Sequence, residues 1–260
     1  MAEHKEIYQR ASYYDTVFCR DVQRDIIFMQ AAFRRYAGHE LTSIIDIACG
    51  PGYHARTAAR MGLRALGMDL RPEMLEFAKQ QAPDAPVDWM VGDMCDFKLD
   101  KPVDVAGCFY DSIDAMINDE MMVEHFRAVA DNLSPKGLYI IECIHPRDCS
   151  TTHYGLHRHR GARDGVLVEC VIGTNRPEFN PVTGIGEVEF QMRIFEDGQE
   201  QRISEKSQER LYSPQIIKLL AEKSGALNVV GWFGAFDLEQ PLDNTSNSQG
   251  MIGVLQKVDG

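Results

Sequence analysis

The stretch IIDIACGPGYHA (residues 44–55) combines residue types that could bind a small ligand. An apolar run contains one acid, Asp46, and the chain then turns through Gly50 and Gly52 before a helical pattern begins. Glycines permit a tight bend and let the backbone approach a ligand closely. The first turn of a helix offers unpaired N–H groups. The stretch therefore predicts a nucleotide-binding turn between a buried strand and a helix.

Two further acids narrow the choice of ligand. Asp69 ends the next predicted strand in the motif GMDL, and Asp93 ends the third in VGDM. A relaxed dinucleotide fingerprint, G-x-G-x-x-A with an acid about 20 residues further on, is also satisfied. A dinucleotide would place its pyrophosphate beside the turn, where the Asp46 carboxylate would repel it. Acids at three strand ends instead favour an adenosine with positive charge and no phosphate, as in S-adenosylmethionine (SAM).

Strands and helices alternate from residue 43 to residue 143, which predicts an α/β fold with a doubly wound, Rossmann-like, mostly parallel sheet. The predicted strands are 43–48, 63–70, 87–93, 103–110 and 137–143, and the predicted helices are 20–37, 55–61, 72–81 and 119–133. Residues 144–164 have the composition of a long loop. Strand-like runs at 165–174, 185–196 and 200–212 follow with no helix between them, which predicts an antiparallel β layer inserted after strand five. A helix at 213–226 and strands at 227–234 and 250–258 come last.

This order predicts four parts of the chain. Residues 1–40 form an N-terminal helical lid, and residues 41–145 form the ligand-binding core. Residues 146–212 form a loop and an antiparallel cap on the substrate side, and residues 213–260 complete the core sheet.

The charge and the cysteines limit the class of protein. The net charge of −12 argues against nucleic acid or an anionic membrane as the main partner. The N-terminus is polar and lacks an apolar signal core. Seven scattered cysteines without a CxxC pair favour reduced thiols over disulfides. We expect a cytoplasmic protein.

Four motifs, DIACGPG, GMDLRPEML, GDMCDF and LSPKGLYIIE, resemble in this order the successive motifs of class I SAM-dependent methyltransferases. The resemblance covers residues 42–145. It implies that SAM is the cofactor and that its methionine part, ribose and adenine contact residues at matching positions. These are Asp46, Ala48, Gly50, Gly52 and Phe109 for the methionine part, Asp69 with Leu70 and Met74 for the ribose, and Asp93 with Met94 for the adenine.

A narrower resemblance extends to both ends of the chain. YYDTVF (13–18), the antiparallel layer and ERLYSPQIIKLLAEKSGA (209–226) resemble small-molecule N-methyltransferases, including the dimethyltransferases of nucleotide-linked amino sugars. In that group a tyrosine of a YD motif reaches the cofactor, and Tyr14 matches it. The group's SSIGH motif after strand four reads DSIDA (111–115) here, so Ala115 stands at the histidine position. This departure leaves both the sugar acceptor and the base open.

Methyl transfer from a sulfonium is an in-line displacement, for which the protein mainly positions the reactants. An acceptor amine must be unprotonated, and a hydroxyl or thiol needs a base. Candidates follow strands four and five, where doubly wound sheets bind ligands. His145 is a candidate base or a loop-orienting residue, and Tyr14 a lid or a base. Asp114 is a second candidate catalytic acid; with Asp111 and Tyr110 it could contact an acceptor amine, or the two acids could cap the next helix.

The segment 145–163 concentrates basic residues in an acidic chain. Guanidinium groups suit phosphate or carboxylate, so we expect an anionic group of the acceptor to bind here, although a solvated loop or a contact in a homodimer would have the same composition. The residues are Arg147, Arg158, Arg160 and Arg163. The spacing of the neighbouring Cys149, His153, His157 and His159 matches no common zinc site, so no metal is expected.

The combined prediction is a SAM-dependent methyltransferase that acts on a small, polar, anionic metabolite at nitrogen or oxygen. Two alternatives stay open at this level. A SAM-binding sensor would share the cofactor motifs without the chemistry, and an NAD-dependent oxidoreductase would share the glycine turn.

Overall fold

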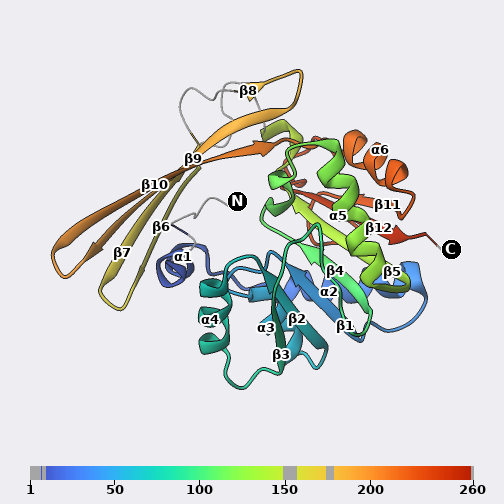
Figure 1. The fold of residues 1–260 in the computed structure, drawn as a ribbon, viewed down its shortest axis with the longest axis horizontal. Coiled ribbons are helices and arrows are strands. Elements are labelled where there is room, and N and C mark those ends of the chain that lie inside the picture. Colours follow the sequence, from blue (N-terminus) through green and yellow to red (C-terminus); the bar gives the residue numbers. More distant parts are fainter. Residues whose placement is uncertain (1–6, 8–9, 149–156, 174–178, 259–260) are drawn as a thin grey trace.

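The computed structural model describes residue 7 and residues 10–148, 157–173 and 179–258. Two sheets organise this part of the chain (Figure 1). One has seven strands, most of them parallel, and the other is antiparallel and has five. The predicted α/β fold class is thereby confirmed.

The main sheet has the strand order β11-β12-β5-β4-β1-β2-β3. Only β12 pairs antiparallel to its neighbours, β5 and β11. The order reverses between β1 and β4, and ligands of open α/β sheets bind at such a reversal, beyond the carboxyl ends of the strands. The strands are β1 (Ser43–Ile47), β2 (Arg64–Asp69), β3 (Val87–Val91), β4 (Val103–Cys108), β5 (Leu133–Cys143), β11 (Leu227–Phe233) and β12 (Met251–Lys257).

Helices cover both faces of the main sheet, because its strands are apolar on both sides. Phe126 of α5 and Ile217 of α6 belong to the apolar core on one face, and Phe28 of α2 and Ala58 of α3 to the core on the other. Pairing and packing leave β1 and β4 fully buried. The helices are α2 (Gln23–Ala37), α3 (Tyr53–Arg60), α4 (Pro72–Gln81), α5 (Asp119–Asn132) and α6 (Pro214–Ser224).

The antiparallel sheet forms a cap beside the carboxyl edge of the main sheet (Figure 1). Alternate residues of β9 are buried, from Val188 to Ile194, and pack with Ile7 and the short helix α1 (Ala11–Phe18). The sheet has the order β10-β9-β7-β6, with β8 paired to β9. Its strands are β6 (His157–Arg163), β7 (Val166–Ile172), β8 (Phe179–Asn180), β9 (Ile185–Glu196) and β10 (Gln199–Arg210).

One segment of the predicted loop 144–164 is instead a strand. Residues 157–163 form β6, and α1 was not expected as a separate helix. The sequence HRHRGAR lacks an apolar alternation, so β6 depends on pairing with β7 and on packing against α1. Gly161 permits this packing, because a Cβ there would overlap the carbonyl oxygen of Thr16.

The division into four parts stays a prediction, as does the cytoplasmic location. The six cysteines in the described part of the chain are free thiols. None of the helices that the structure describes is long and apolar enough to cross a membrane.

Candidate functional site

The predicted glycine turn connects β1 to α3 at the reversal of strand order. Ala48, Gly50 and Gly52 have positive φ angles of 54°, 51° and 75°, so the chain bends sharply over the ends of β1 and β2. The Gly50 N–H donates to Oδ2 of Asp69 at 2.7 Å, and the Arg71 N–H donates to Oδ1 of the same carboxylate at 2.8 Å. The acid that ends β2 therefore holds the turn in place.

Gly52 is required by packing as well as by its dihedral angles. A Cβ at this position would lie 2.7 Å from Cζ3 of Trp89 and closer still to Cη2. The indole of Trp89, on β3, also covers Gly67 of β2. A side chain at either glycine would push the indole away from the turn.

Asp46 lies beneath the turn and is 2% exposed. Oδ2 accepts a hydrogen bond from the Ala55 N–H at 3.3 Å, in the first turn of α3. Burial raises the pKa of Asp46 to about 6, while the nearby His54 lowers it and Asp69 raises it. The carboxylate is thus charged at neutral pH and close to its titration range, as suits an acid that binds a cation.

Tyr14 reaches the same region from α1. Burial raises the pKa of its phenol, and the charges of Asp69 and Asp111 raise it further. The hydroxyl stays protonated near neutral pH. This position fits a lid over the cofactor better than a base.

The other predicted cofactor residues differ in burial and in their contacts. Met74 is fully buried, whereas Leu70 is exposed. Asp93 is exposed, and its Oδ1 accepts the Cys95 N–H at 2.9 Å. Met94 packs against the core, and Phe109 stacks on His54 with ring centroids 3.8 Å apart. Their contacts with a cofactor stay predictions.

Acids gather at the end of β4. Tyr110 and Asp111 have φ angles of 54° and 60°, unusual for residues with side chains. Asp111 accepts the Ile144 N–H, and Asp114, in the 3₁₀ turn Ser112–Ala115, is 3% exposed. Glu209 of β10 lies close enough to influence both acids.

These acids titrate at unusually high pH. Burial, with the charges of Glu142 and Glu209, raises the pKa of Asp111 to about 7. Burial, with the charges of Asp111 and Glu209, raises the pKa of Asp114 well above its usual value. Asp111 keeps surface that is open to solvent. The two acids therefore keep their protons to a higher pH than ordinary carboxyl groups, and Asp111 does so where a ligand can reach it.

His145 is 5% exposed and has partners at both ring nitrogens. Nε2 lies 2.8 Å from the Asp243 carbonyl oxygen, to which it donates, and Nδ1 accepts the Arg147 N–H at 3.1 Å. This arrangement favours the loop-orienting interpretation over a base.

The four predicted arginines do not converge. Arg147 donates to carbonyls of the C-terminal loop, including that of Thr245 at 2.6 Å. Arg163 pairs with the buried Asp15 of α1. His159 and Arg163 of β6 face α1, so the alternation of the strand turns Arg158 and Arg160 to the opposite face of the cap.

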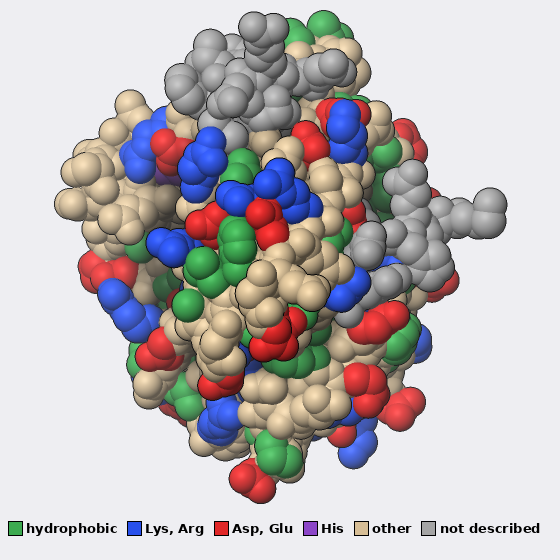
Figure 2. Space-filling view, turned by 90° about the vertical axis from the view of Figure 1, so that its left-hand side faces the viewer, with side chains coloured by type: hydrophobic (Ala, Val, Ile, Leu, Met, Phe, Trp, Pro, Cys, Tyr) green, Lys and Arg blue, Asp and Glu red, His purple; other side chains and the backbone are tan. Residues whose placement is uncertain are grey.

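The opposite face of the cap is mixed in charge. Arg160 lies 3.7 Å from Glu169, and basic and acidic side chains are interspersed at this end of the molecule (Figure 2). A role for Arg158 and Arg160 in anion binding stays a prediction. Cys149 and His153, considered for zinc, lie outside the described residues.

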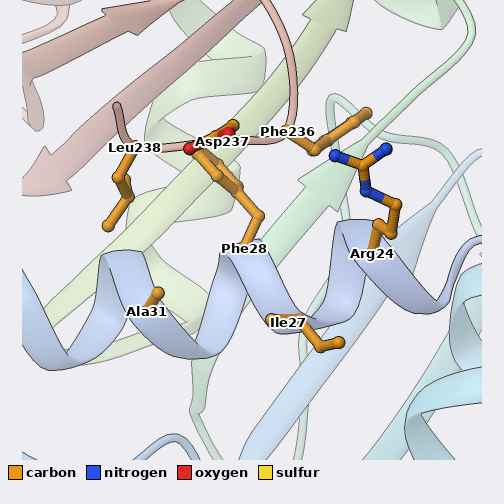
Figure 3. A pocket seen from close by; sticks show the side chains of 7 residues that line it. All are labelled: Arg24, Ile27, Phe28, Ala31, Phe236, Asp237 and Leu238. Atoms are coloured by element: carbon orange, nitrogen blue, oxygen red, sulfur yellow. The ribbon is translucent and has the colours of Figure 1, made fainter. Parts of the chain in front are cut away.

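A hollow separate from the strand ends lies between α2 and the segment 236–238 (Figure 3). Phe28 and Ile27 of α2 line it, with Arg24 and Asp237 at its charged side. It shares none of the acids described above.

Sequence reasoning missed five charged residues of the site region. Glu209 comes from the cap, and the others surround the turn. They are Arg20, Asp25, His54 and Glu142. His54 lies inside the glycine-turn motif, and this position was the one signal that could have drawn attention to it.

Comparisons with known proteins agree with this geometry. Residues 44–137 match a family model described as a methyltransferase domain. This confirms the predicted resemblance for the core of the chain.

Curated relatives match less than half of the chain. A dTDP-3-amino-3,6-dideoxy-α-D-glucopyranose N,N-dimethyltransferase of Streptomyces fradiae is 29% identical over 47% of this chain and 47% of its own. A dTDP-4-amino-2,3,4,6-tetradeoxy-D-glucose N,N-dimethyltransferase of Saccharopolyspora spinosa is 31% identical over 40% of this chain and 41% of its own. The matches thus span less than half the length of these relatives.

Solved structures share the fold over the whole chain. A SAM-dependent methyltransferase of Clostridium acetobutylicum superposes with a TM-score of 0.76 at 16% identity, covering 98% of this chain and 99% of its own. A SAM-bound amino pentose methyltransferase of Micromonospora echinaspora gives 0.70 at 16% identity, covering 99% and 98%. The antiparallel cap is therefore part of a fold that other proteins share.

Proposed function

We propose that this chain, whose residues 44–137 form a methyltransferase domain, transfers a methyl group from SAM to a small polar acceptor. The observation that carries the proposal is the buried, ionisable Asp46 beneath a glycine turn that Asp69 holds in place. A carboxylate beneath the turn would repel a pyrophosphate and attract a cation. The NAD-dependent alternative therefore has no support in the geometry.

The residues present fit SAM. Asp46 would face the cationic methionine part, beneath the turn of Gly50 and Gly52. Each oxygen of the Asp69 carboxylate accepts one backbone N–H and keeps capacity for a second hydrogen bond, which suits the ribose hydroxyls. Tyr14 would cover the cofactor from α1. When bound, SAM supplies an electrophilic methyl group, and the protein has to position the acceptor and control its proton.

The acceptor atom that the acids favour is an amine nitrogen. Asp111 and Asp114 place two carboxyl groups at the end of β4, and the Tyr110 hydroxyl is buried without a hydrogen-bond partner among the described residues. An ammonium group would be held by these acids. Asp111, with a pKa near 7, could take its proton so that the lone pair becomes available.

Two curated relatives have names that specify dTDP-linked amino sugars. An acceptor of this kind combines an amine with a diphosphate, so it would satisfy both the acids and the predicted anion site. The acids, however, face the strand ends, whereas Arg158 and Arg160 face away from α1. The amine is therefore the better supported half of the proposal.

The test has two steps. Mass spectrometry of ligands that survive native purification should find SAM or S-adenosylhomocysteine. Labelled SAM should then transfer methyl to amino sugars and not to matched sugars with a hydroxyl in place of the amine. Binding of SAM without transfer to any amine, hydroxyl or thiol in the panel would support a sensor instead. Recovery of NAD would refute the proposal.

A further inference from the structure

Five ionisable side chains form a continuous network behind the glycine turn. Nε2 of His54 lies 3.0 Å from Oδ2 of Asp25, and Nδ1 lies 4.0 Å from Oδ2 of Asp46. Arg20 reaches the same Asp25 oxygen at 3.3 Å and Glu142 at 2.9 Å. Residues from α3, α2, β1, β5 and the segment before α2 are thus linked in one chain of contacts.

The network ends at the acceptor side of the site. Oε2 of Glu142 accepts the Tyr110 N–H at 3.1 Å, and the Arg20 guanidinium lies 4.1 Å from the centroid of the Tyr110 ring. The Asp111 N–H donates to the Glu142 carbonyl at 3.2 Å. Glu142 therefore holds Tyr110 and Asp111, the two residues after β4 that have positive φ angles. These contacts join Asp46 on the proposed cofactor side to Asp111 on the proposed acceptor side.

His54 occupies the position that decides the charge of the network. It is 2% exposed, and its ring stacks on Phe109. A carboxylate only accepts hydrogen bonds, so Nε2 must carry the proton that Asp25 receives. Nδ1 lies 4.0 Å from the Asp46 carboxylate, so a positive charge on this ring would act directly on Asp46.

With a doubly protonated histidine, the three carboxylates and two cations of the network leave one net negative charge. The methionine part of SAM, with a sulfonium, an ammonium and a carboxylate, carries one net positive charge. The negative charge of the network and the positive charge of SAM therefore complement each other. With a neutral His54, the network would carry two negative charges before SAM binds.

We propose that His54 is a positioning residue that keeps Asp46 ionised for SAM and connects it, through Asp25 and Arg20, to the acceptor side. The proposal rests on the proposed function. It extends that function by assigning a role to a residue that lies outside both the proposed cofactor side and the proposed acceptor side.

Other titratable groups also lie near these atoms. Around Asp46 they are Asp69 of β2 and the thiols of Cys49 and Cys108, whose pKa is raised by burial so that they stay neutral. The Tyr110 phenol lies near His54, and its pKa is also raised by burial. His54 is the neighbour that lowers the pKa of Asp46.

The test is the pH dependence of SAM affinity, measured by calorimetry for the wild type and His54→Gln. The amide can still donate to Asp25 but carries no charge. Wild-type affinity should fall as the pH drops through about 6, the pKa of Asp46. In the variant this midpoint should rise by at least about one pH unit, and affinity at pH 7 should fall about tenfold. The exposed His39 provides the matched control, since His39→Gln should change neither quantity.

The outcomes separate the two proposals. If the wild type fails to bind SAM at every pH, both are refuted. If it binds SAM and His54→Gln keeps the affinity and the midpoint, the role of His54 alone is refuted. Should the variant not fold, nitrogen NMR of the wild-type histidine rings decides: two protonated nitrogens on His54 at pH 7 are expected, and a ring with one proton overturns the inference.

Discussion

Gly52 offers the sharpest test of how the turn is built. Its φ of 75° costs a residue with a side chain about 1–2 kcal/mol. The added Cβ would also lie 2.7 Å from Cζ3 of Trp89 and 3.3 Å from Cβ of Ala78, and overpacking of this kind costs about 1–3 kcal/mol. Gly52→Ala should therefore lower the free energy of unfolding by about 2–5 kcal/mol.

Gly50→Ala is the matched control. Gly50 also has a positive φ, of 51°, but an added Cβ would meet no atom within 4 Å. Only the backbone cost of about 1–2 kcal/mol applies there. Urea unfolding followed by circular dichroism measures both variants, and equal slopes against urea concentration would show that the change lies in stability.

A double-mutant cycle then isolates the contact with the indole. In the Trp89→Leu background the clash is removed, so Gly52→Ala should cost about as much as Gly50→Ala does in the wild type. Equal losses for the two glycine variants in the wild type, or an unchanged cost of Gly52→Ala in the Trp89→Leu background, would refute the argument that Trp89 excludes a side chain from this turn.

Three further predictions concern ligand binding and the reaction. Asp69→Ala should weaken SAM binding in calorimetry by roughly ten- to a hundredfold, since a hydrogen bond to a charged group contributes about 1.5–3 kcal/mol; unchanged affinity would remove Asp69 from the site. The rate with an amine acceptor should rise with pH through about 7 as Asp111 loses its proton. Asp111→Asn should abolish this rise and leave SAM affinity the same. If the rise with pH persists in the variant, the proton belongs to another group. Arg158→Ala and Arg160→Ala should raise the KM of an anionic acceptor, and added salt should have the same effect. The control is Arg202→Ala, at an exposed position of β10. If the β6 variants do not differ from this control, an anion site on β6 is excluded.

The sequence by itself determined the main sheet and the place of its glycine turn. Apolar runs and helical periodicity are local properties, so the predicted helix 72–81 and strand 185–196 coincide with α4 and β9. The other predicted strands and helices of the core lie within a few residues of the observed ones. The glycine turn was visible because backbone geometry restricts the residue type at Gly50 and Gly52.

Only the tertiary structure decided which charges meet. Asp15 and Arg163 are far apart in the sequence, yet they join α1 to β6. Glu209 reaches Asp111 and Asp114 only because the cap folds over the end of β4. A strand of charged residues such as β6 has no apolar period, so its pairing and the direction of its arginines follow from its neighbours.

The role proposed for His54 shows the same limit. Its residue type suggests several functions, and the sequence places no acid beside it that would select one. Asp25 comes from another helix and Asp46 from the preceding strand, and packing on Phe109 sets the ring between them. Periodicity along the chain encodes which face of an element is buried, but the partner of a buried charge depends on how the elements pack, which is why the network was found in the structure and not in the sequence.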